Sequence, residues 1–135
     1  MVRLHQRGHD ILFFRVLLVI TFCSITWLAL TPQPSAEITL GWDKANHLAA
    51  FFVLAFLSEY SFQPATSLRK IVIGLTLAIY GLAIELFQSL TQARFFEVGD
   101  LLADLIGVIG YMIVAEPLKR FTPLRAISGL DDVAD

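Results

Sequence analysis

The chain has 135 residues, of which 56% are hydrophobic, and its mean hydropathy is +0.69. This length permits one domain, and the apolar share exceeds that of ordinary soluble globular proteins, so a membrane protein is predicted. Charged residues make up 16% and the net charge is -2, which excludes the basic surface that nucleic-acid binding requires. A single cysteine, Cys23, excludes an internal disulfide and a thiolate metal site.

The first predicted transmembrane helix covers residues 11–30, a nearly continuous apolar run. About 20 residues at a rise of 1.5 Å match a hydrocarbon core of about 30 Å. Residues 1–10 are predicted to be a cytoplasmic leader, in which Arg3 and Arg7 carry positive charge. The leader also suits a signal peptide, but no small-x-small cleavage site follows before Glu37, so an uncleaved span is favoured.

Three further spans follow a loop that contains two prolines and a glycine and ends at Trp42, a natural interface anchor. These spans are predicted at residues 43–62, 71–90 and 100–115. Pro117 is predicted to close the last helix, and residues 117–135 to form a solvated cytoplasmic tail.

The distribution of basic residues supports the membrane interpretation. The second and fourth spans are short or polar at one end, so a soluble helical core is the competing interpretation. With a cytoplasmic amino terminus, only Lys44 and Arg94 lie outside. The other basic residues all fall on the cytoplasmic side: Arg3, Arg7, Arg15, Arg69, Lys70, Lys119, Arg120 and Arg125. The predicted fold is therefore an all-α bundle of four transmembrane helices with both termini in the cytoplasm.

Small residues recur at the spacing used in close helix packing. They are Gly74 and Ala78 on the third span, and Ala103 and Gly107 on the fourth. Packing within the monomer is favoured over a dimer seam, but the motif does not identify the partner helix, so the oligomeric state is left open.

The polar residues of the predicted spans gather at one membrane surface. The topology places the start of the second span, the end of the third and the start of the fourth on the outer side. This region contains Asp43, Lys44, His47, Glu85, Gln88, Arg94, Glu97, Asp100 and Asp104. Residues three or four apart share a helix face, so three polar stripes are predicted to converge on one pocket.

Glu85 is the most informative member, because it lies more than a turn inside its span and an ionisable group there is costly unless it is paired. Lys44, Arg94 or a proton is its expected partner. The carboxylates outnumber the cations, so a protonated carboxyl, a charged His47 or a bound cation is inferred to balance the site.

Several members also have simpler explanations. Asp43 and Asp100 stand where helix N-caps are expected. Lys44 is long enough to reach the membrane surface, and Glu97 suits a solvated loop. His47 fits a satisfied core residue equally well. Elsewhere, Glu59 and Glu116 lie near basic residues at cytoplasmic helix ends and are predicted to be structural: these two carboxylates are not assigned to the pocket.

The order of these residues resembles that of the VanZ-like family of membrane proteins. The similarity runs from about Trp42 to Val114. It rests on Asp43-Lys44-x-x-His47 with Phe51 and Phe52, Tyr80-Gly81-x-x-x-Glu85-x-x-Gln88, and Arg94 through Asp100, Asp104 and Gly107. The resemblance implies a multi-pass protein of the bacterial cytoplasmic membrane, related to one that raises resistance to teicoplanin, a lipid-tailed glycopeptide. The family commonly has Asn where this chain has Asp104, so a mechanism that needs a neutral amide is in doubt.

Three functions are compared. The favoured one is a non-catalytic envelope protein whose outward-facing pocket binds a lipid head group or a lipid-linked cell-wall compound, with no cofactor or metal. The alternative is a membrane enzyme acting on a lipid-linked substrate through Glu85, Asp104 and His47, although no nucleophile signature is present. Proton-coupled transport is disfavoured, because the polar residues stop in the outer half of the membrane.

Overall fold

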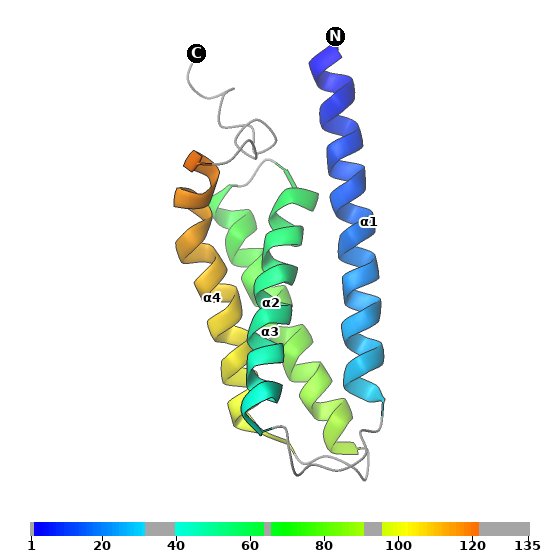
Figure 1. Ribbon diagram of the computed structural model, residues 1–135, viewed down its shortest axis with the longest axis vertical. Coiled ribbons are helices and arrows are strands. Elements are labelled where there is room, and N and C mark those ends of the chain that lie inside the picture. Colours follow the sequence, from blue (N-terminus) through cyan, green and yellow to red (C-terminus); the bar gives the residue numbers. More distant parts are fainter. Residues whose placement is uncertain (1, 32–39, 64–65, 91–95, 122–135) are drawn as a thin grey trace.

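The computed structural model describes residues 2–31, 40–63, 66–90 and 96–121. These residues form four helices: α1 (Val2–Leu30), α2 (Leu40–Ser61), α3 (Ser67–Leu90) and α4 (Val98–Phe121). The predicted all-α, four-helix bundle is confirmed (Figure 1). α1 begins at Val2, so the basic leader is the first part of this helix rather than a separate segment.

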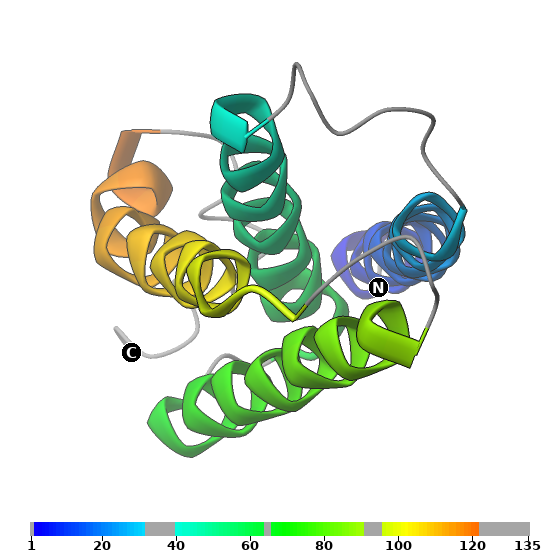
Figure 2. The same cartoon turned by 90° about the horizontal axis from the view of Figure 1, so that it is seen from below.

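α2 occupies the centre of the bundle, where it contacts each of the other three helices. Figure 2 shows α1 and α4 on opposite sides of α2. At one end of the bundle lie the start of α1, the turn between α2 and α3, and the end of α4 (Figure 1). This end is called the turn end. The other end, where α2 and α4 begin and α1 and α3 finish, is called the polar end.

Three helical segments are long and apolar enough to cross a membrane: Gly8–Leu30, Ser67–Leu90 and Val98–Lys119. The chain is therefore a multi-pass membrane protein. α2 does not meet the same criterion, because Asp43, Lys44, His47 and Glu59 lower its hydropathy. Three of these four side chains, those of Lys44, His47 and Glu59, contact residues of α4 or the chain just before it. α2 thus pairs polar side chains inside the bundle, where lipid contact is avoided.

Close contact between α2 and α4 depends on Gly107. A Cβ atom at this position would collide with the carbonyl oxygen of Leu48 and would lie 3.1 Å from the backbone nitrogen of Phe52. On the other interface of α4, a Cβ atom at Gly74 of α3 would lie 3.1 Å from Met112 Cε. Both small residues therefore pack against helices of the same chain, as the favoured interpretation expects.

A buried ionic network joins α2 to α4 near the turn end. Glu59 and Lys119 are only 3% and 2% exposed, and Lys119 Nζ donates to Glu59 Oε1 over 2.6 Å. The Tyr111 hydroxyl donates to the other oxygen of Glu59, and Lys70 Nζ lies 3.7 Å from Oε1. Lys70 also donates to Glu116 over 2.6 Å. Every charge here has a partner, which a buried ion pair requires.

The prediction that Pro117 closes the last helix is wrong, because α4 continues to Phe121. Proline lacks the N–H that would bond the carbonyl four residues earlier, so continuation of the helix needs other support. The ion pair between Lys119 and Glu59 supplies it by holding the last turn of α4 against α2. This long-range contact has no counterpart in the local sequence.

Candidate functional site

The polar end of the bundle brings together residues from three helices. Eight of the nine predicted cluster residues are described, and they are Asp43, Lys44, His47, Glu85, Gln88, Glu97, Asp100 and Asp104. The ninth, Arg94, lies outside the described residues. Asp43, Lys44 and His47 occupy the first turns of α2, Glu85 and Gln88 the last turns of α3, and Asp100 and Asp104 the first turns of α4.

The buried centre of this site is a pair between His47 and Asp104. Their side chains are 12% and 1% exposed, and His47 Nδ1 lies 2.9 Å from Asp104 Oδ1. With its proton on Nδ1, the imidazole donates to the carboxylate and turns Nε2 toward Asp100, whose Oδ2 lies 4.0 Å away. A Cβ atom at Gly81 would lie 2.6 Å from Asp104 Oδ2, so this glycine makes room for the carboxylate beside α3.

Lys44 forms hydrogen bonds with two acidic residues, one just before α4 and one in its first turn. Its Nζ donates to Glu97 Oε2 over 2.8 Å and to Asp100 Oδ1 over 3.3 Å. The side chains of Lys44 and Glu97 are 41% and 45% exposed, so their contact is screened by solvent, whereas Asp100 is buried. A Cβ atom at Gly99 would lie 2.8 Å from Lys44 Cε, so Gly99 lets the lysine cross the start of α4.

The N-cap interpretation of the two aspartates does not hold. α2 begins at Leu40 and α4 at Val98, so Asp43 and Asp100 lie inside the first turn of their helices rather than before it. Negative charge in a first turn still complements the helix dipole. The Asp100 side chain additionally accepts a hydrogen bond from Lys44.

Glu85 accepts a hydrogen bond from the backbone rather than from Lys44. Its Oε2 accepts a hydrogen bond of 3.2 Å from the backbone N–H of Glu97, immediately before α4, while Lys44 is bonded to Glu97 and Asp100. Glu85 is 1% exposed. Among the described residues, no hydrogen-bond partner reaches Glu85 Oε1 or Asp104 Oδ2, although both atoms are buried. Buried acceptor atoms normally have a hydrogen-bond donor, and a ligand or a water molecule could supply one to these two atoms.

A cleft of about 400 Å³, lined in part by His47, lies between α1, α2 and α3. One part of its lining is polar, namely Asp43, Asn46, His47 and Gln88. The rest is apolar and consists of Ile25, Leu28, Ala29, Ala50, Phe51 and Ile84. This space is called the polar-end cleft.

Two contributors to the cleft were missed from the sequence. Asn46 precedes His47 within the predicted second span, and its polarity at that depth was the available signal. α1 looked like a plain apolar span, yet Ile25, Leu28 and Ala29 form one wall of the cleft. Gln88 holds that wall in place, because its Nε2 donates to the carbonyl oxygen of Ala29 over 2.9 Å.

Three side chains of the site carry oxygen or nitrogen atoms of the kinds that ligate a metal cation. Candidate ligand atoms of Asp43, His47 and Asp100 lie within 4.8 Å of one another. Carboxylate and imidazole ligands suit Zn²⁺ at about 2.0–2.2 Å, and the Asp104 contact to Nδ1 is the kind of outer interaction that orients a ligating histidine. The sequence predicted no metal, so this grouping is a feature that only the structure displays.

Comparison with known proteins matches residues 10–120 to the family described as VanZ/LLP1. No curated protein and no solved structure matches the chain. The matched region includes all of the polar-end residues and extends the similarity seen from Trp42 to Val114 to the first span as well. The chain belongs to the VanZ/LLP1 family.

Proposed function

We propose that this protein binds the head group of a lipid, or of a lipid-linked cell-wall compound, at the polar end of its bundle. The polar-end cleft carries the proposal, because its lining combines four polar side chains with apolar walls. Such a combination suits an amphiphile whose polar group meets His47 and Gln88 while its hydrocarbon contacts Ile25, Leu28 and Ile84.

The hydrogen-bonding chemistry favours a ligand that donates. Lys44 is already shared between Glu97 and Asp100, whereas Glu85 Oε1 and Asp104 Oδ2 are buried acceptors without a described partner. The side-chain oxygens of Asp43, Asn46 and Gln88 line the cleft and can accept hydrogen bonds, so an ammonium group or a sugar hydroxyl suits it. The first turns of α2 and α4 add positive potential for a neighbouring phosphate, so a head group that carries both an amine or hydroxyls and a phosphate fits best.

The proposed setting is the bacterial cytoplasmic membrane with both termini in the cytoplasm, so that the polar end faces outward. The segregation of basic residues supports this orientation. A carboxyl-terminal reporter fusion that is active only in the cytoplasm is the expected result. A fusion active only outside the membrane would contradict the orientation.

We also propose a role in glycopeptide resistance, which the resemblance to the VanZ-like family suggests. Survival of a bacterial strain exposed to these antibiotics tests this role. A susceptible strain expresses wild type, Glu85→Gln or Glu116→Gln at matched membrane levels and is exposed to teicoplanin or to a non-lipidated glycopeptide. Glu116 is the matched control, because it is an exposed glutamate that lies away from the polar end and pairs with Lys70. Selective protection by wild type and Glu116→Gln, lost in Glu85→Gln, is expected.

Two results would contradict this proposal in different ways. Absence of protection by a wild type verified in the membrane would remove the resistance role and leave lipid-linked ligands as the proposed class. Equal protection by wild type and Glu85→Gln would separate resistance from the polar end altogether.

The alternative function is a membrane enzyme acting on a lipid-linked substrate. The contact between His47 and Asp104 favours it, because a buried carboxylate that orients an imidazole is a frequent arrangement for a general base. Purified protein is incubated with an extract of lipid-linked cell-wall precursors, and their loss is followed by mass spectrometry. Turnover that His47→Gln abolishes would support catalysis, and unchanged precursors with wild type would favour binding alone.

A further inference from the structure

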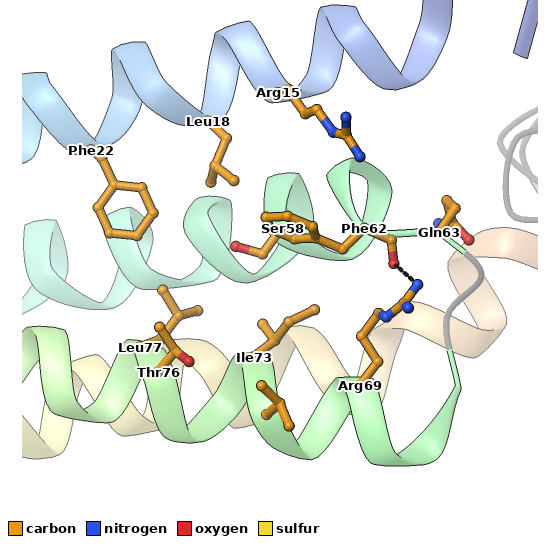
Figure 3. Close-up of a pocket in the computed structure, with 11 residues that line it drawn as sticks. Arg15, Leu18, Phe22, Ser58, Phe62, Gln63, Arg69, Ile73, Thr76 and Leu77 are labelled. Atoms are coloured by element: carbon orange, nitrogen blue, oxygen red, sulfur yellow. Dashed lines mark hydrogen bonds between the residues drawn. The ribbon is translucent and has the colours of Figure 1, made fainter. Parts of the chain in front are cut away.

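A second cleft, of about 500 Å³, lies between α1, α2 and α3 at the turn end (Figure 3). It is called the arginine cleft and is lined by Arg15, Leu18, Phe22, Ser58, Phe62, Gln63, Arg69, Val72, Ile73, Thr76 and Leu77. It shares no lining residue with the polar-end cleft, so its role is independent of the proposed function.

Two guanidinium groups stand at one end of this cleft, near Phe62 (Figure 3). Arg15 Nε donates to the carbonyl oxygen of Ser61 over 3.1 Å, and Arg69 Nη1 donates to the carbonyl oxygen of Phe62 over 3.0 Å. The Arg15 guanidinium also lies 6.0 Å from the centre of the Phe62 ring. Backbone carbonyls orient both groups, and the Phe62 ring lies beside that of Arg15.

Glu59, which follows the lining residue Ser58, does not itself line the cleft. Glu59 is turned toward α4, where Lys119 and Tyr111 bind both of its oxygens. Arg15 forms no ion pair with a carboxylate in the part of the chain that the structure describes. Among its lining residues, the cleft contains two cationic and no acidic side chains.

Away from the arginines, the walls of the cleft are apolar. Leu18 and Phe22 of α1 face Ile73 and Leu77 of α3 across it (Figure 3). Because an apolar surface in a membrane protein contacts hydrocarbon, these side chains suit an acyl chain. The cleft therefore has the polarity of a phospholipid, with a cationic end for a phosphate and an apolar length for the tail.

We propose that the arginine cleft is a binding site for an anionic phospholipid, with the phosphate held by Arg15 and Arg69 and one acyl chain lying between α1 and α3. Guanidinium groups bind phosphate through short, often paired hydrogen bonds. A bound lipid would also fill the space between α1 and α3.

The test is lipid selectivity of the full-length protein in a neutral detergent. Native mass spectrometry compares binding of phosphatidylglycerol and phosphatidylcholine that carry identical acyl chains. Wild type is expected to prefer phosphatidylglycerol. Arg15→Gln with Arg69→Gln is expected to lower that preference roughly tenfold, since two charge-assisted hydrogen-bonding groups are lost. Arg15→Lys with Arg69→Lys retains both charges and is expected to keep most of the preference.

A steric pair of variants locates the tail. Val72 lines the cleft and its neighbour Ile71 does not, although the two are similarly exposed, at 52% and 58%. Val72→Trp is expected to reduce bound phosphatidylglycerol, and Ile71→Trp to leave it unchanged. Glu85→Gln, which tests the polar end, is expected to leave the lipid preference intact.

Equal binding of the two lipids by wild type would overturn the site. So would an unchanged preference in the glutamine double variant, or equal binding by Val72→Trp and Ile71→Trp. Because the lysine double variant and both tryptophan variants keep the charges of the chain, a loss confined to the glutamine variant and Val72→Trp is not explained by general misfolding.

Discussion

Gly107 is predicted to be indispensable to the contact between α2 and α4. In Gly107→Ala, the new methyl group would overlap the Leu48 carbonyl oxygen and approach the Phe52 nitrogen to 3.1 Å. Both are backbone atoms, so a rotamer change does not relieve the contact. A carbon and an oxygen in close contact normally lie about 3.3 Å or more apart, and the two helices would have to separate by roughly 1 Å.

The expected magnitude combines two opposing terms. Alanine gains about 1 kcal/mol over glycine in helix propensity, and overpacking of a fitted interface costs about 1–3 kcal/mol. Gly107→Ala should therefore lower the free energy of unfolding by up to about 2 kcal/mol. Gly110 is the matched control on the same helix, since a Cβ atom there would meet only Phe52 Cδ2, at 4.0 Å. Gly110→Ala should stabilise the protein by up to about 1 kcal/mol.

The assay is SDS titration of purified protein in detergent, with helix content followed by circular dichroism. The midpoint for Gly107→Ala should fall below that of wild type, and the midpoint for Gly110→Ala should be equal or higher. If the two alanine variants unfold at the same SDS concentration, the close approach of α2 and α4 at Gly107 is wrong.

The same titration tests three other contacts. Lys119→Met leaves the buried Glu59 carboxylate without its principal cation and should lower the free energy of unfolding by about 3 kcal/mol. The double variant Glu59→Leu with Lys119→Met should recover much of this loss. If the single and the double variant are equally unstable, the paired network is contradicted. Asp104→Asn keeps an acceptor for His47 and should change the midpoint little, but Asp104→Leu should lower the free energy of unfolding by about 1–3 kcal/mol. Similar midpoints for the two variants would contradict the hydrogen bond between His47 and Asp104. Thr66→Ala removes the hydroxyl that accepts a hydrogen bond from the backbone N–H of Arg69 at the start of α3, and it should lower the free energy of unfolding by about 1 kcal/mol. An unchanged midpoint would show that this helix cap is dispensable.

The number of helices and their order along the bundle follow from hydropathy and helix breakers. Each apolar run has a length suited to the bilayer, and short connections make successive helices antiparallel. Antiparallel order alone places the start of α2, the end of α3 and the start of α4 at one end, so the proximity of His47, Glu85 and Asp104 was accessible from the sequence. Their recurrence at fixed spacing also indicated the family, to which residues 10–120 are matched.

Pairing within the polar end was not accessible in this way. Which side chain meets which depends on the rotation of each helix about its axis, and that rotation is set by packing between distant segments. Gly99 and Gly81 let Lys44 and Asp104 come close to neighbouring backbone, so Lys44 meets Glu97 while Glu85 receives a backbone N–H. Sequence spacing on a single helix contains no information about these contacts.

The sequence by itself therefore determined a multi-pass helical protein of known family with its ionisable residues concentrated at the ends of its helices. Tertiary structure alone decided the rest. It carried α4 beyond Pro117 through the bond from Lys119 to Glu59, and it placed α1 so that Arg15 and Arg69 share one cleft. The physical reason is the same in both cases. Hydropathy measures the average cost of placing a segment in lipid, whereas these features depend on contacts between particular atoms far apart in the chain.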